Sequence, residues 1–71
     1  MSILHTFPLA VIEDATGKTL HETAHFKGYI PQKLEYFTVN NSVRYRVLQR
    51  EFFYNADMEV IAVELIVVVL G

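Results

Sequence analysis

Residues 59–70 read E-V-I-A-V-E-L-I-V-V-V-L, and this stretch decides the fold. β-Branched residues dominate it, and it contains no Gly, Pro, Asn or Asp, which is the composition of a β-strand. From residue 60 onward, Glu64 is the only position on either side of that strand that is not apolar. A strand with one solvent-exposed side would alternate apolar with polar residues. Both sides of this strand therefore require a cover.

The length and composition indicate one small domain over residues 1–71, with 52% hydrophobic residues and no cysteine. A chain of this size buries only about 60% of the surface that it exposes when unfolded. Small domains gain stability from disulfides, metals or oligomerisation. Because disulfides are excluded, we expect a homo-oligomer, a dimer or higher, and no cofactor.

The net charge of −2 gives no general attraction to nucleic acid or to an anionic membrane. The first residues lack the basic start and long apolar core of a signal peptide. The final apolar run is shorter than the roughly 20 residues of a spanning helix, and it carries Glu59 and Glu64. These features predict a cytoplasmic protein without membrane association.

The remaining chain predicts further strands separated by turns rich in Asp, Asn and Gly. Regular strand is expected at 9–13, 34–39 and 43–54, with Pro8 at a sheet edge, a bulge or a strand start. Residues 19–28 allow two readings, because T-L-H-E followed by Gly28 also matches a capped short helix. Strand is favoured, since Phe26 falls outside the weak helical stripe.

Five short strands at this spacing predict an all-β fold, a five-stranded SH3-like small barrel or a strongly bent antiparallel sheet. A core is expected from the odd positions of the last two strands. Gln49 and Glu51 share that parity but are polar, so either a bulge near them or a strand end that leaves the core is expected. The expected core residues are Val43, Tyr45, Val47, Phe53, Ile61, Val63, Leu65, Val67 and Val69.

The opposite side of the same two strands is half apolar and bordered by charge, a combination that usually marks an interaction site. An arginine across from Glu64 would satisfy that carboxylate, although an exposed pair contributes only about 0–1 kcal/mol. The predicted interface residues are Leu48, Phe52, Tyr54, Val60, Ala62, Ile66, Val68 and Leu70.

The segments G-Y-I-P (residues 28–31), Leu34-Glu35 and Y-R-V (residues 45–47) resemble several families of short bacterial and phage all-β domains of uncharacterised function. Those families carry a G-x-x-P-x-x-G-E segment, a short strand, a turn and then Y-x-V. Here Lys33 and Leu34 stand where the glycine is expected. The resemblance spans about the second half of the chain and implies an SH3-like barrel without catalytic activity.

Residues 21–25 spell H-E-x-x-H, the spacing with which two histidines one helical turn apart bind zinc in metalloproteases. On a strand, His21 and His25 would lie about 13 Å apart, too far to share one ion. We therefore expect no metal site and no catalytic residue, and a hydrolase using His21, Glu22 and His25 is the least favoured alternative.

Arg44, Arg46 and Arg50 lie among aromatic residues and could bind single-stranded nucleic acid by phosphate pairing and stacking. Acidic residues and the negative net charge argue against it. The function expected from the sequence is a non-enzymatic structural or interaction module that self-associates through its C-terminal strand. A small-barrel nucleic-acid-binding protein is the main alternative, and a different protein partner is left open.

Overall fold

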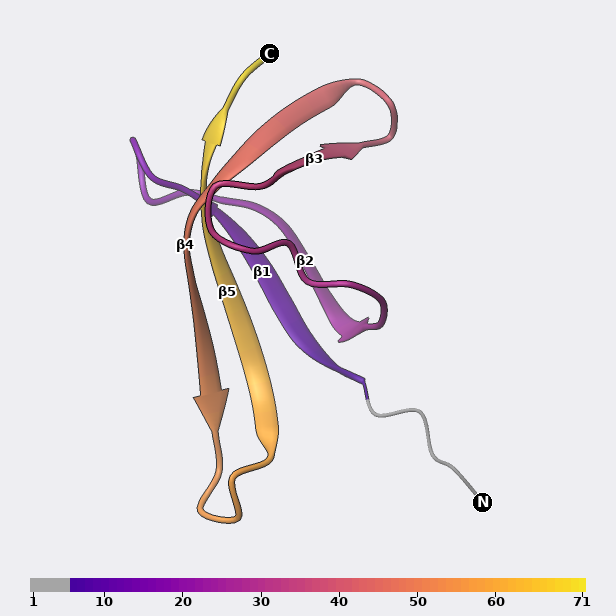
Figure 1. The fold of residues 1–71 in the computed structure, drawn as a ribbon, viewed down its shortest axis with the longest axis vertical. Helices are drawn as coiled ribbons and strands as arrows, with labels where there is room; N and C mark the ends of the chain where they lie inside the picture. The colour runs from indigo at the N-terminus through magenta and orange to yellow at the C-terminus, as the bar shows by residue number, and fades with distance from the viewer. Residues whose placement is uncertain (1–5) are drawn as a thin grey trace.

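The computed structural model describes residues 6–71 as a single five-stranded sheet (Figure 1). No helix occurs among these residues, so the predicted all-β class is confirmed. The order across the sheet is β2-β1-β5-β4-β3. The strands are β1 (Phe7–Glu13), β2 (Thr19–Phe26), β3 (Tyr36–Val39), β4 (Val43–Tyr54) and β5 (Val60–Val69).

The C-terminal strand β5 lies at the centre of the sheet, between β1 and β4. It pairs antiparallel with β4, as expected for two consecutive strands, but parallel with β1. The sheet is therefore mixed and not wholly antiparallel. The β1–β2 hairpin and the β3–β4 hairpin are joined through this one strand.

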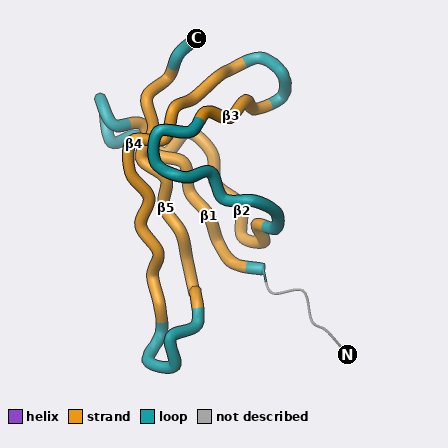
Figure 2. The backbone as a smooth tube through the Cα atoms, viewed as in Figure 1, coloured by secondary structure: helices purple, strands orange, loops and turns teal. Residues whose placement is uncertain are grey.

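The sheet curls into a half-barrel, the architecture of a small SH3-like barrel (Figure 2). Its curvature is visible in one contact, in which His21 Nε2 on β2 lies 3.0 Å from the Tyr45 hydroxyl on β4. These strands are three positions apart in the sheet and would be separated by about 14 Å if it were flat. The two rings meet edge to face, with centroids 5.7 Å apart.

The core lines the concave side of this half-barrel, which we call the inner face. Leu9 and Val11 of β1 pair with Val63 and Leu65 of β5, and all four side chains are buried. The predicted core residues Tyr45, Val47, Val63, Leu65 and Val67 are confirmed as buried, and Val43 packs against them half-buried. Regular alternation over residues 43–47 and 63–67 explains this success.

Three predicted core residues were wrong: Phe53, Ile61 and Val69 are 36%, 50% and 38% exposed. The cause for the first two is a pair of bulges between β4 and β5, one at Leu48 and one at Ile61. An extra residue in one strand reverses which side the following residues face. Phe53 consequently pairs with Ala62 on the convex side. Val69 lies at the last position of β5, beyond the buried part of the core.

Residues 19–26 form a strand, as predicted. A further bulge sets the two residues Ala24 and His25 against Pro8, whose ring nitrogen cannot donate to the ladder. This bulge confirms one of the expected places for Pro8, although β1 begins at Phe7, two residues before the predicted start. The short strand β3 begins at Tyr36, later than expected, because Leu34 adopts a positive φ of 72°.

The connection from β2 to β3 covers part of the inner face. Ile30 packs against the core, and the Leu34 amide donates to the Val47 carbonyl at 2.7 Å. The Val47 amide in turn donates to the Glu35 carbonyl at 2.9 Å. This connection therefore supplies a cover for part of the inner face.

Candidate interaction surface

The convex side of the sheet, which we call the outer face, carries the second apolar surface predicted from the sequence. Strand register assigns ten residues of β1, β4 and β5 to it: Ala10, Ile12, Arg46, Gln49, Glu51, Phe53, Ala62, Glu64, Ile66 and Val68. Every close backbone contact between strands of residues 6–71 joins hydrogen-bonded neighbours, so no described strand packs over this face. Val68, which pairs with Arg46 on this face, is 37% exposed.

The predicted interface residues divide between the two faces. Ala62, Ile66 and Val68 lie together on the outer face, as expected, and Leu48 is the half-buried extra residue of the first bulge. Phe52 and Val60 instead pack against the core, because the bulges turn them to the inner side. Tyr54 and Leu70 are exposed, at the end of β4 and just beyond β5.

Three carboxylates follow one row across the outer face. Glu51 pairs directly with Glu64, which is beside Ala10, and Ala10 pairs with Glu22 on β2. No arginine lies opposite Glu64 to satisfy it, because the bulge at Leu48 brings Glu51 there instead. Within residues 6–71 no cation forms an ion pair with any of these three side chains, so their charge is uncompensated.

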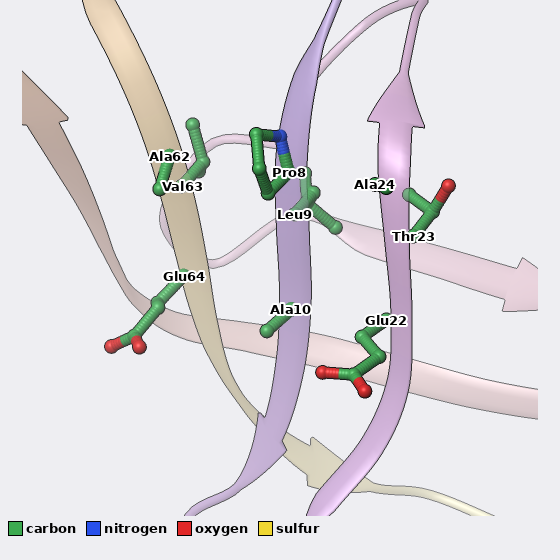
Figure 3. A pocket seen from close by; sticks show the side chains of 9 residues that line it. All are labelled: Pro8, Leu9, Ala10, Glu22, Thr23, Ala24, Ala62, Val63 and Glu64. Atoms are coloured by element: carbon green, nitrogen blue, oxygen red, sulfur yellow. The ribbon is translucent and has the colours of Figure 1, made fainter.

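The same row borders an open hollow of about 560 Å³ above β1 (Figure 3). Its floor is formed by small side chains, including Pro8, Ala10, Ala24 and Ala62. Glu22 and Glu64 stand on either side of Ala10 in this view. The hollow is open because the side chains that β1, β2 and β5 contribute to its floor are small.

The arginines predicted as one group are divided in the same way. Arg44 and Arg46 both lie over the ring of Tyr36, with their guanidinium carbons 4.3 and 5.5 Å from its centroid. Arg50 follows the bulge, pairs with Leu65, and lies over the Phe52 ring at 5.2 Å. A positive patch therefore remains with two arginines and one tyrosine, beside Val68 on the outer face.

Arg46 is held in this patch by its ring contact and by packing. Its Nε is buried, and no acceptor for it exists in the described part of the chain. Arg46 pairs with Val68 across the ladder, and Glu64 is four residues before Val68 on β5. At about 3.3 Å per residue the two charged rows lie about 13 Å apart along the strands. The outer face thus has a basic end and an acidic row, with an apolar band around Ile66 between them.

The H-E-x-x-H residues do not form a metal centre in residues 6–71. They lie on strand β2 and not on a helix, and no three His, Asp or Glu side chains gather there around a common point. His21 is engaged by Tyr45, and His25 Nδ1 lies 3.4 Å from the Thr6 hydroxyl. The strand geometry removes the helical zinc motif as support for a hydrolase.

One titratable pair with shifted pKa values lies in the β2–β3 connection. The Gln32 amide donates to Glu35 Oε1 at 2.6 Å, and the Tyr29 hydroxyl donates to the same oxygen at 3.0 Å. These two hydrogen bonds, the amide first, lower the pKa of Glu35. The bond to Glu35 raises the pKa of Tyr29. Both side chains are exposed, and their hydrogen bonds link Tyr29, Gln32 and Glu35 within the β2–β3 connection.

Comparisons of the chain with known protein families, with curated proteins and with solved structures found no match. The described residues contain no helix with the length and apolar character needed to cross a membrane.

Proposed function

We propose that this protein is a non-enzymatic interaction module that self-associates through the outer face of its sheet. The observation that carries the proposal is the apolar band of β5 on that face, where Ile66 and Val68 stay partly exposed with no described strand above them. Burial of apolar surface contributes roughly 25 cal/mol per Å², so a second copy placed there supplies a cover that the strands of residues 6–71 do not provide.

The size and composition of the chain support a second copy as the cover. A domain of 71 residues without cysteine has a small core, and only seven hydrophobic side chains of the described residues are buried in it. Association that occurs only in the folded state stabilises that state by mass action. Interfaces that bury an apolar centre inside a charged border are typical of protein–protein contacts.

Sedimentation equilibrium over a wide concentration range tests this proposal. The natural chain should associate reversibly, and Val68→Asp should abolish association while the chain stays folded by circular dichroism. Met58→Asp is the matched control, because Met58 is an apolar residue that is 72% exposed in the β4–β5 turn, away from the outer face. A natural chain that remains monomeric at high micromolar concentration would disprove self-association.

A second candidate function, binding of single-stranded nucleic acid, is supported by one observation. Arg44 and Arg46 flank the exposed ring of Tyr36 and form no ion pair within residues 6–71, so cations and a stacking surface lie together. It ranks second because Arg50 is turned to the other side and the net charge is −2. Salt-dependent retention on a single-stranded DNA column that Arg46→Glu removes would support it, and no retention would exclude it.

A further inference from the structure

The charges on the outer face define how a second copy can lie on it, an inference that rests on the proposed self-association. We infer that two copies stack face to face about a two-fold axis that crosses β5 at Ile66, so that Arg46 of each copy meets the Glu51–Glu64 pair of the other. The partner is a second copy of this chain, and the contact is the same from both sides.

The register of β4 and β5 sets the geometry of this contact. Ile66 pairs with Gln49, the Glu51–Glu64 pair lies two residues away along β5 in one direction, and the Arg46–Val68 pair lies two residues away in the other. A two-fold axis in the interface, across the strands at Ile66, exchanges these two rows. Val68 of one copy then lies over Glu64 of the other, and Arg46 lies over Glu51.

The other simple arrangement fails on charge. A two-fold axis along β5 would place each row over the same row of the second copy. Glu64 would then face Glu64 of the second copy, with two further carboxylates, Glu51 of each copy, beside them. Like charges facing each other across an interface oppose that arrangement, and complementary rows select the first one. Because the outer face is convex, the two copies touch along β4 and β5. Stacked sheets lie about 10 Å apart where they meet, with strand directions within about 30° of each other, which leaves Arg46 above the Glu51–Glu64 pair.

The arrangement also gives partners to charged groups that form no ion pair among residues 6–71. Glu51 and Glu64 oppose each other without a cation, and Arg46 is held by Tyr36 without a carboxylate in the described residues. In the stacked pair each charge acquires an opposite neighbour. The apolar side chains of Ile12 and Ile66 lie in the row between the two charged contacts and are excluded from water.

Charge reversal in two separate chains tests the arrangement. Arg46→Glu and Glu51→Arg should each weaken self-association at least about tenfold, equivalent to about 1.4 kcal/mol, because like charges then face each other. Mixed together, the two variants should form a heterodimer, since the side chain at position 46 of each copy then faces an opposite charge at position 51 of the other. The controls Lys18→Glu and Asp57→Arg carry the same charge changes in exposed turns and should associate like the natural chain.

The outcomes separate this inference from the function on which it rests. A natural chain that never associates overturns both the proposed self-association and the inferred arrangement. A natural chain that associates while both variants associate equally well leaves self-association standing and overturns the charge-matched arrangement. Two folded variants that stay monomeric alone and also when mixed overturn it as well. Heterodimer formation supports it, and it also shows that both variants fold.

Discussion

Glu51 and Glu64 face each other directly across the antiparallel β4–β5 ladder, on the outer face and with no cation of the described residues between them. Like charges in such a cross-strand pair destabilise a sheet, and opposite charges contribute roughly 0.2–1 kcal/mol. This pair therefore lowers the stability of the isolated chain. The contact with a second copy inferred above would offset this repulsion, because it places Arg46 of the other copy beside the two carboxylates.

Glu51→Lys should stabilise the isolated chain by about 0.2–1 kcal/mol, because an attractive pair replaces a repulsive one. The measurement is urea unfolding at low protein concentration, where association does not add to stability. The same substitution should weaken self-association. An unchanged unfolding midpoint would indicate that the two carboxylates are too well solvated to interact.

The contact between His21 and Tyr45 should be measurable as a loss of stability when the hydroxyl is removed. Tyr45→Phe should cost about 0.5–1.5 kcal/mol, because the hydroxyl is buried with its hydrogen bond to the imidazole. Tyr54→Phe is the matched control, since the Tyr54 side chain is exposed and stacks on Phe52. Equal stability of the two variants, by urea unfolding, would show that the contact contributes nothing.

Leu65 and Ile61 offer a test of the corrected core. Leu65→Ala should cost about 2–5 kcal/mol, because Leu65 is among the fully buried side chains. Ile61→Ala should change stability by no more than about 0.5 kcal/mol, since this residue is half exposed in a bulge. Thermal unfolding followed by circular dichroism distinguishes them. A large loss of stability with Ile61→Ala would indicate that Ile61 is buried in the core.

The Glu35 carboxylate should make the order of the β2–β3 connection depend on pH. Its pKa is lowered in the folded chain, so its contribution is fully present above the ordinary pKa of glutamate, about 4.3, and is lost as the pH falls through the lower folded value. The Gln32 amide should therefore be less protected from exchange with solvent at acid pH. Glu35→Gln should remove this pH dependence, and an ordinary pKa for Glu35 in an NMR titration would contradict it.

Local patterns were sufficient to predict the strands but not their pairing. Composition and turn residues predicted five strands, and β4 begins and ends at the predicted residues. The bulge near Gln49 was expected from two polar residues at core positions, yet its consequence for Phe52 and Phe53 depends on which residue of β5 each one opposes. Alternation within one strand does not contain that information.

The inferred interface likewise depends on the pairing between strands, which the sequence pattern does not give. Ile66 and Val68 were placed on the exposed face by parity alone, because no bulge separates them from the core residues of β5. The carboxylate row was not foreseen, since it joins residues of three strands that only the register brings together. The parallel pairing of β1 with β5 was likewise hidden, because it joins segments far apart in the chain.

The central position of β5 has a consequence for how the protein is made. A ribosome releases the β1–β2 and β3–β4 hairpins before the segment that holds them together, and hairpins of this size are marginal alone. Native structure must then wait until β5 leaves the exit tunnel, when β1 and β4 can both dock on it. Once β5 has emerged, we expect the long-range β1–β5 pairing, and not the closing of the hairpins, to limit the folding rate of this domain.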